Sequence, residues 1–464
     1  MYEKYKNKLP QGWVECQLGE VFNIVNGDRG KNYPAKNKLH ASGIPFVSAI
    51  NIQNSKLFIE NLLYLNEQQY DLLRSGKINK GDTLLCIRGS IGKHCIYPFN
   101  KGAIASSMVI IRKILPNIDK FLFYYLESFY FRQEVKKYDN GTAQPNLSAS
   151  DLKRFNYLLP PLNEQKRIVE KIESEFAKID EGLEHLLKAK EQIKQYRQSV
   201  LKSAFEGKLT QQNPDDEPAE ILLQKINSKT NCAHNINLPQ GWIRCKLGEA
   251  FNIERGGSPR PIKEYLTSSK DGINWIKIGD TKNTSKYIFE TKEKIKPEGI
   301  RHSRFVAVGD LILSNSMSFG RPYIMKTSGC IHDGWVVFRN QYKIATEEFL
   351  YYMLSSQKIY SEFSRVATGS TVKNLNIDRI KGVNIIIPPL NEQKRIVEEI
   401  EKRFAVADEA EKVVEDSIEK AKQLKQSILK KAFEGRLVSQ DPNDEPASKL
   451  LEKIKQERNK NDRK

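Results

Sequence analysis

Two stretches of the chain repeat apolar residues at the spacing of a long amphipathic helix. Residues 163–206 and 391–434 contain no proline, and each follows a Pro-Pro pair and precedes a glycine. Prolines stop the preceding element, and Asn163 and Asn391 stand where N-capping residues are expected. The pattern predicts two helices of about 42 residues, each roughly 60 Å long.

Both stretches also fit a heptad repeat, which is typical of a coiled coil. Lys190 interrupts the first seam where the second has Ile418, and Glu411 interrupts the second where the first has Leu183. Pairing of either helix with its own copy would stack like charges, so we expect the two helices to pair with each other. Packing of each helix on its own half of the chain is the alternative. The predicted seam consists of Val169, Ile172, Phe176, Ile179, Leu183, Leu186, Val397, Ile400, Phe404, Val414, Ile418 and Ile428.

Shorter apolar patterns surround these stretches and are of two kinds. Residues 81–99 and 309–326 are short apolar runs between glycines, as in strands and turns. Residues 119–138 and 346–366 repeat apolar residues at helical spacing. The fold class predicted for each half is therefore mixed α/β, in the sense of α+β.

The two halves of the chain carry the same segments in the same order. Between these anchors, residues 25–140 and 254–368 diverge almost completely. Two repeats of this length predict two similar modules about an approximate twofold axis, which makes the helix pair antiparallel. The repeated segments include LPQGW at 9–13 and 238–242, PPLNEQKRIV at 160–169 and 388–397, and DEPA at 216–219 and 444–447.

The repeats divide the chain into two modules, two long helices and two connecting segments. Residues 437–455 repeat the segment at 209–227, which precedes the second module. We therefore expect the tail to pack back towards the first module. The predicted divisions are a first module at 1–162, a long helix at 163–207, a linker with a short helix at 208–237, a second module at 238–390, a second long helix at 391–435 and the tail at 436–464.

The net charge of +18 is confined to the two modules. Residues 1–162 carry 22 Lys and Arg against 13 Asp and Glu, and residues 238–390 carry 23 against 14. The segments that contain the long helices are close to neutral. Two basic blocks joined by neutral ones indicate two modules that bind one polyanion.

Signals for catalysis, metal binding and export are missing from the sequence. The six cysteines form no C-x-x-C pair and the six histidines never fall at metal-ligand spacing. The sequence has no phosphate-binding G-x-x-x-x-G-K-[ST] loop and no [DN]-P-P-[YF] methyltransferase motif. It also has no apolar run of membrane-spanning length. We therefore expect a non-catalytic, cytoplasmic protein with buried, reduced thiols and no metal site.

The repeated motifs resemble those of the specificity (S) subunits of type I restriction-modification systems. The resemblance covers both halves and rests on "LPQGW…LGE" at the start of each module, "G-[ST]-x-x-x-NL" near its end, "PPLNEQKRIV" at the start of each long helix and "SxLKxAFEGxL…DEPA" after it. It implies two target-recognition domains, each reading one half of a split double-stranded DNA site, and an antiparallel coiled coil that sets the gap between the halves.

The resemblance also implies the partners and the cofactors of the complex. The helices would dock two modification subunits, which carry S-adenosylmethionine and methylate adenine. Restriction subunits with ATP-driven translocation and magnesium-dependent nuclease activity would join that core. The specificity subunit itself would hold no cofactor and catalyse nothing.

Candidate DNA-contacting residues are polar or cationic side chains on predicted loops, because base edges and phosphates are bound by such groups. Asn146 and Asn374 are identical in the two repeats and are expected to hold turns. For each of the others, a solvated surface charge is the alternative interpretation. The candidates are Arg29, Lys31, Arg88, Ser90, Lys93 and Gln144 in the first module, and Arg255, Ser258, Arg260, Asn315, Ser316, Arg321, Thr371 and Lys373 in the second.

Two other classes of function fit the sequence less well than DNA recognition. A fused restriction-methylation enzyme needs catalytic motifs that the chain lacks. A scaffold that binds only proteins does not explain why the net charge is confined to the two modules. A DNA-specificity subunit accounts for both observations.

Overall fold

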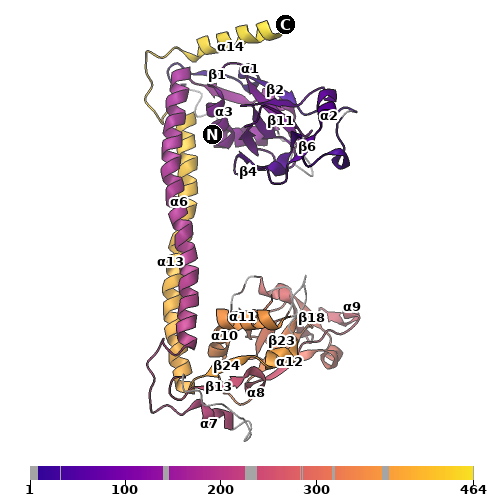
Figure 1. Cartoon of the computed structure of the whole chain (residues 1–464), viewed down its shortest axis with the longest axis vertical. Coiled ribbons are helices and arrows are strands. Elements are labelled where there is room, and N and C mark those ends of the chain that lie inside the picture. The colour runs from indigo at the N-terminus through magenta and orange to yellow at the C-terminus, as the bar shows by residue number, and fades with distance from the viewer. Residues whose placement is uncertain are drawn as a thin grey trace. The chain divides into compact units, whose positions relative to one another are not determined.

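The chain folds as two compact units (Figure 1). Unit 1 comprises residues 1–186 and 416–464, and unit 2 comprises residues 187–415. The computed structural model describes residues 9–31, 33–138, 146–224, 238–282, 284, 286–315, 319–367 and 376–462. Two long helices, α6 (Leu162–Phe205) and α13 (Leu390–Phe433), each contribute one half to each unit.

Unit 1 contains two four-stranded sheets and two strand pairs. The sheets have the orders β6-β3-β10-β7 and β2-β11-β8-β9, and the pairs are β1-β12 and β4-β5. All strand pairs are antiparallel except β3 with β10. The strands are β1 (Val14–Gln17), β2 (Phe22–Asn26), β3 (Ile44–Val47), β4 (Ile52–Gln53), β5 (Lys56–Leu57), β6 (Leu63–Leu65), β7 (Lys77–Asn79), β8 (Thr83–Cys86), β9 (His94–Ile96), β10 (Lys101–Ile104), β11 (Met108–Lys113) and β12 (Asn156–Leu159); the short helices are α1 (Leu18–Val21), α2 (Glu67–Leu72), α3 (Asp119–Glu127), α4 (Phe129–Tyr138), α5 (Ala149–Lys153) and α14 (Ala447–Asp462).

Unit 2 repeats this topology with one additional edge strand in each sheet. Its sheets have the orders β15-β18-β16-β22-β19 and β14-β23-β20-β21-β17, and its strand pair is β13-β24. The parallel pair β16-β22 corresponds to β3-β10 of unit 1. The strands are β13 (Ile243–Lys246), β14 (Asn252–Arg255), β15 (Leu266–Thr267), β16 (Ile273–Ile276), β17 (Tyr287–Ile288), β18 (Glu293–Ile295), β19 (Arg304–Val306), β20 (Leu311–Ser314), β21 (Pro322–Met325), β22 (Gly329–Ile331), β23 (Trp335–Arg339) and β24 (Asn384–Ile387); the short helices are α7 (Ala219–Gln224), α8 (Leu247–Ala250), α9 (Ile262–Tyr265), α10 (Glu347–Ser355), α11 (Gln357–Val366) and α12 (Ile377–Lys381).

One sheet in each unit is buried on both faces. In unit 1, Leu84 and Ile110 face the core between the two sheets, whereas Leu85 faces a second core that the helices cover. In unit 2, Ile312 faces the inter-sheet core and Leu313 the helical one. Successive side chains of a strand point to opposite faces, so β8 and β20 are buried along their whole length instead of alternating between buried and exposed residues. The mixed α/β prediction is confirmed, and the divergent sequences adopt one topology.

Each long helix begins one residue earlier than predicted. The structure begins α6 at Leu162 and α13 at Leu390, so the prediction that Asn163 and Asn391 are N-caps is wrong. The first helical hydrogen bond of α6 runs from Gln165 N to Pro161 O at 2.9 Å, and α13 repeats it. Because Pro161 can supply a carbonyl without needing its own N–H, the helix starts directly after it.

The halves of α6 and α13 pair in antiparallel orientation within each unit (Figure 1). In unit 2, Lys190 contacts Glu415 at 2.6 Å, and Arg197, further along α6, contacts Glu411 at 2.6 Å, earlier in α13. In unit 1, Lys425 contacts Asp180 at 2.6 Å. The antiparallel coiled coil is confirmed, and the two charged residues that interrupt the seam are paired with opposite charges.

The predicted seam residues near the start of each long helix contact the adjacent module. Ile172 is fully buried in the core of the unit 1 module, and the ring of Phe176 lies 5.9 Å from that of Tyr124 in α3. Phe404 makes the corresponding contact with Tyr352 of α10 at 5.7 Å. The apolar stripe near each helix start therefore packs on the module as well as on the other helix. Val169, Val397, Ile400, Val414 and Ile428 are buried, and Ile179, Leu183, Leu186 and Ile418 are half-buried.

The repeated motifs contact one another at the start of each long helix. In unit 2, Arg395 of α13 contacts Asp216 of the DEPA motif at 2.6 Å, and in unit 1 Arg167 of α6 contacts Asp444 at 2.7 Å. Each Arg lowers the pKa of its Asp partner. The stability that each ion pair adds to the folded chain is therefore fully present above the ordinary pKa of Asp. It is lost as the pH falls through the lowered pKa of the folded state.

A buried carboxylate completes this contact in unit 2. Glu392 Oε2 accepts a hydrogen bond from Trp242 Nε1 of the LPQGW motif at 2.8 Å. Glu392 Oε1 accepts a second one from Gln212 Nε2 at 3.3 Å. Burial raises the pKa of Glu392, and the hydrogen bonds from Trp242 and Gln212 lower it. Three separate repeats thus meet at one point, which explains why they recur together.

The tail packs on the start of the unit 1 module. Ala447 N donates to Gly12 O at 2.8 Å, as Ala219 N donates to Gly241 O at 2.9 Å in unit 2. Helix α14 then adds Leu450 to the unit 1 core and lies against α1 (Figure 1). The segments on either side of the second module therefore perform the same packing role in different units.

The described cysteines are buried thiols. Burial raises the pKa of Cys16 and of Cys95 to about 12, so both stay protonated at neutral pH. Cys86, Cys245 and Cys330 are also buried, and Cys232 lies outside the described residues. Among the described helices, none is both long and apolar enough to cross a membrane.

Arginine-to-alanine substitutions test the contact at the helix start. Arg395→Ala leaves the nearly buried Asp216 without its cation, so we expect the free energy of unfolding to fall by roughly 1–3 kcal/mol. We expect the same loss for Arg167→Ala. In the control Arg403→Ala, an exposed pair with Glu399 on the same helix is lost, and the change should stay below about 0.5 kcal/mol. Urea unfolding of the full chain measures all three, and equal effects would contradict the assigned role.

Candidate nucleic-acid interface

The predicted DNA-contacting residues gather at one edge of the doubly buried sheet in each unit. In unit 1 this edge is formed where β2 and β8 end and β11 begins, because β2 and β8 both pair antiparallel with β11. In unit 2 it is formed where β14 and β20 end and β23 begins. The two edges are structurally equivalent, although their loops share almost no sequence.

Two arginines lie close together at the unit 1 edge. Arg29 Nη2 donates to Ser106 O at 3.3 Å, and Arg88 Nε donates to Asn146 Oδ1 at 3.1 Å. Burial lowers the pKa of Arg29, and the positive charge of Arg88 lowers it further. Both side chains are exposed. Two like charges held side by side at a surface favour an anionic partner.

The neighbouring turns in unit 1 add further polar groups. Ser90 and Lys93 are exposed in the turn between β8 and β9, where Lys93 N donates to Ser90 O at 3.3 Å. Lys31 is exposed beyond β2. Gln144 lies outside the described residues.

The unit 2 edge is organised around Asp333, which precedes β23. Its carbonyl oxygen accepts from Arg255 Nε at 3.1 Å, and its Oδ1 accepts from Ser258 Oγ at 2.9 Å. Arg260 Nη2 lies 3.6 Å from its Oδ2 and is largely exposed. Asp333 therefore contacts three of the predicted residues. The guanidinium groups of the two arginines among them lie at the surface.

Asn315 differs from the other predicted residues because it is fully buried. Its Nδ2 donates to Asp333 O at 3.3 Å and its backbone N donates to Gly334 O at 2.9 Å. Asn315 therefore holds the Asp333 loop and does not face solvent. Arg321 is exposed in the turn between β20 and β21. Ser316, Thr371, Lys373 and Asn374 lie outside the described residues.

Two organising residues were not among the predicted contacts. Asp333 was missed because an acidic side chain is not expected at a polyanion-binding surface. Its Asp-Gly sequence was nonetheless a turn signal. Asn146 was expected to hold a turn, and it also orients Arg88. No group of three or more His, Cys, Asp or Glu side chains could hold a metal ion within the described ranges.

The comparison with protein families matches both halves of the chain. The model of the type I restriction modification DNA specificity domain matches residues 10–193 and again residues 239–420. The chain belongs to this family. Each matched range spans one module and most of the long helix that follows it.

Curated relatives of this specificity-domain chain match over nearly its whole length. The type I restriction enzyme StySPI specificity subunit of Salmonella potsdam is 27% identical over 479 residues, covering 98% of this chain and 97% of the relative. The EcoKI specificity subunit of Escherichia coli is 26% identical over 475 residues, covering 97% and 96%.

Solved structures share the fold of this specificity-domain chain. A chain from a study of complex assembly and conformational transition of the type I R-M system has a TM-score of 0.70 at 22% identity, covering 93% of this chain and 100% of that one. The HsdS subunit of Thermoanaerobacter tengcongensis has a TM-score of 0.51 at 21% identity, covering 94% and 100%.

Replacing Asn315 tests whether this residue holds the Asp333 loop in place. Asn315→Ala removes a buried amide and leaves the Asp333 carbonyl without one of its donors, so the free energy of unfolding should fall by roughly 1–3 kcal/mol. Asn252→Ala, at an exposed position in β14, should change it by less than about 0.5 kcal/mol. Urea unfolding measures both, and a stability of Asn315→Ala equal to that of the unsubstituted chain would show that Asn315 does not hold the loop.

Proposed function

We propose that the chain is the DNA sequence-specificity subunit of a type I restriction-modification complex. In this proposal residues 1–162 and 238–390 are target-recognition domains, and each reads one half of an asymmetric bipartite site in double-stranded DNA. The chain contributes recognition and no catalysis. Support comes from its family, from relatives that are specificity subunits over nearly the full length, and from the two basic modules.

The main support for the proposal is that the candidate residues lie at structurally equivalent sheet edges in the two units. Each edge presents arginines, but the residues that carry and orient them differ. In unit 1, Asn146 orients Arg88, whereas in unit 2 Asp333 binds Arg255. Equivalent places with different side chains are what two readers need when the two half-sites differ.

The exposed side chains supply the chemistry for reading and for holding DNA. An arginine can donate two hydrogen bonds to the O6 and N7 of guanine, and any cation can contact phosphate. We assign these contacts to the exposed residues and loop-holding roles to Asn146 and Asn315. The exposed residues assigned to contacts are Arg29, Lys31, Arg88, Ser90, Lys93, Arg255, Arg260 and Arg321. Ser258 is half-buried and is assigned as a further contact, and Gln144, Ser316, Thr371 and Lys373 remain assigned from sequence alone.

The long helices provide the constant part of the device. In our proposal the paired helices set the number of unspecified base pairs between the half-sites and dock two modification subunits. Restriction subunits join that complex in the cytoplasm. S-adenosylmethionine, ATP and magnesium are then bound by those other subunits. The near-neutral charge of the repeated helices agrees with a role in protein contacts.

Substitution of one arginine in each module tests the assignment of half-sites. Arg88→Ala and Arg321→Ala should each weaken binding to the cognate site by about 1–3 kcal/mol if the residue reads a base. Each should relax the preference at one half-site and leave the other half unchanged. Competition gel shifts of the reconstituted complex, with duplexes altered in one half at a time, measure this.

Arg244→Ala serves as the control for both variants, because Arg244 is exposed on β13, which belongs to the β13-β24 pair and not to the sheet with the candidate edge. Wild-type affinity and unchanged preferences in both Arg88→Ala and Arg321→Ala would refute the loop assignment.

Shortening both helices tests the role of the coiled coil. Lys190 pairs with Glu415, so removal of residues 188–194 together with 411–417 takes one matched heptad from each helix. The loss is about 10 Å of helix, the length of about 3 base pairs, so the unspecified gap should shorten by up to about that number. Methylome sequencing of a host that expresses the variant with its partners reads the gap. An unchanged gap would refute this role.

A further inference from the structure

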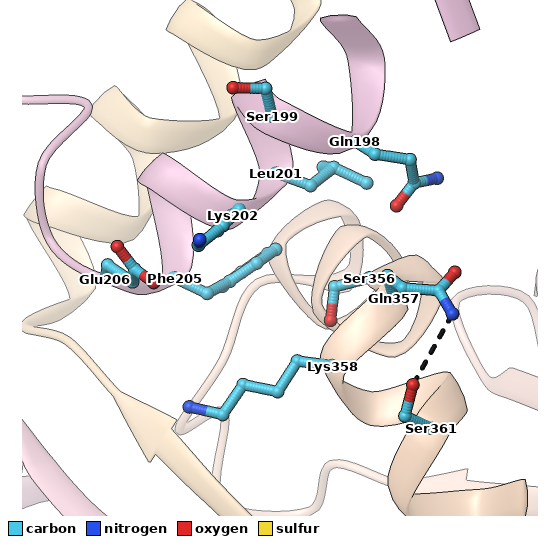
Figure 2. Close-up of a pocket in the computed structure, with 10 residues that line it drawn as sticks. All are labelled: Gln198, Ser199, Leu201, Lys202, Phe205, Glu206, Ser356, Gln357, Lys358 and Ser361. Carbon is cyan, nitrogen blue, oxygen red and sulfur yellow. Dashed lines mark hydrogen bonds between the residues drawn. The ribbon is translucent and has the colours of Figure 1, made fainter. Parts of the chain in front are cut away.

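Unit 2 has an open cavity of about 460 Å³ between the end of α6 and the start of α11 (Figure 2). Leu201, Phe205 and Glu206 line it from the helix side, and Gln357 and Lys358 line it from α11. A second hollow of about 20 Å³ adjoins it and shares Phe205 and Lys358. The ring of Phe205 therefore has open space along part of its surface.

The corresponding place in unit 1 is occupied by the chain's own side chains. Tyr130 in α4 donates from its hydroxyl to Glu434 Oε1 at 3.2 Å, and its ring lies 6.3 Å from that of Phe433. Arg132, one half-turn further along α4, donates to Gln426. Together these side chains bridge α4 and the end of α13.

On the side of the long helices the two places are built from the same residues, whereas α11 has Gln357 and Ser361 where α4 has Phe129 and Gln133. Phe205 and Glu206 match Phe433 and Glu434 in the repeated FEG segment. In both units a buried serine precedes the second helix and caps it: Ser128 Oγ accepts from Phe131 N, and Ser356 Oγ accepts from Ile359 N. The second residue of α4 is Tyr130, and the second residue of α11 is Lys358.

The packing of the two phenylalanines differs at this position and at one other, where unit 1 has Tyr125 and unit 2 has Met353. In unit 1 the ring of Phe433 contacts those of Phe121, Tyr125 and Tyr130, and the residue is 2% exposed. Phe205 contacts the ring of Phe349 and is 8% exposed.

We propose that the unit 2 cavity receives a tyrosine side chain from a modification subunit, with its ring against Phe205 and its hydroxyl donating to Glu206. Unit 1 supplies the template, since Tyr130 makes this pair of contacts within the chain. The identity of the partner rests on the function proposed above, whereas the chemistry of the site does not.

The charges around the cavity agree with this occupant. Lys208 contacts Glu206 at 2.7 Å and lowers the pKa of its carboxyl, so Glu206 is ionised and can accept a hydrogen bond. In unit 1, Arg436 contacts Glu434 in the same way while Tyr130 is bound. The cation beside the carboxylate is therefore compatible with a bound phenol.

Two further ammonium groups, those of Lys202 and Lys358, line the same cavity. They favour a partner segment with acidic residues beside its tyrosine. The inference is that the two units offer different surfaces to two identical modification subunits. One unit has its aromatic group built in, and the other takes it from the partner.

The proposal is tested by placing a tyrosine in the unit 2 cavity at the position that matches Tyr130. Lys358→Tyr changes an exposed residue and should leave the chain folded. Lys358→Met, the matched control, removes the charge without supplying a ring and a hydroxyl. The probe is p-cresol, the side chain of tyrosine, and its binding to the full chain is followed by ligand-observed NMR with toluene as the comparison compound.

We expect p-cresol to bind the unsubstituted chain and Lys358→Met with similar affinity, and Lys358→Tyr more weakly by about tenfold or more. Tyr130→Lys should open a second site in unit 1, with a thermal melt checking that the variant is folded. Unchanged binding by Lys358→Tyr, or binding of toluene as tight as that of p-cresol, would overturn the assignment of the site.

Titration with modification subunits tests the identity of the partner. With Lys358→Tyr, one of two modification subunits should bind about tenfold or more weakly, and the other as it does to the unsubstituted chain. Full affinity for both subunits would overturn the inference while leaving the proposed function intact, because the complex would still form. Failure of the unsubstituted chain to bind any modification subunit would instead refute the proposed function.

Discussion

The start of each long helix is held by a half-buried ion pair to a segment distant in the chain, and the rest of the architecture depends on it. Arg167 binds Asp444 and Arg395 binds Asp216, with a buried glutamate and a tryptophan beside each pair. A long helix alone has no fixed direction relative to the sheet that precedes it. The ion pair and the tryptophan join the helix start and the module start to the tail in unit 1 and to the linker in unit 2, so the helix leaves each module at a defined place.

Because the start of each long helix is fixed in this way, the sequences of the two modules can differ while their fold stays the same. The sheets of both units share one strand order apart from an additional edge strand in each sheet of unit 2. In each unit, the sheet that is buried on both faces demands only that consecutive strand residues be apolar. Leu84 and Ile312 occupy equivalent positions and satisfy that demand although they are different residues. The loops at the sheet edge are not required to be apolar, and their exposed residues differ between the units. Recognition can therefore change while the packing is conserved.

Much of the architecture could be predicted from the sequence because its periodicity is strong. The long helices, their pairing and the mixed α/β modules follow from apolar spacing and from repetition. The helix start was misplaced by one residue, because the carbonyl of Pro161 accepts the first helical bond. Lys190 and Glu411 were interpreted as interruptions of the seam, whereas each pairs with an opposite charge that only the register of the helices reveals.

The candidate site was harder to predict, since loop residues carry no periodic signal. Arg88 and Arg255 were found from residue type, but the groups that orient them, Asn146 and Asp333, come from distant parts of the chain. The cavity beside Phe205 was also invisible, because it depends on one lysine where the other repeat has a tyrosine.

The central claim is that each module reads its own half of the DNA site. It is tested most directly by methylome sequencing of a host that expresses the partners with a chain whose residues 243–387 are replaced by a copy of residues 14–159. The account predicts a site with two identical halves. A site that keeps both of the original halves would contradict it.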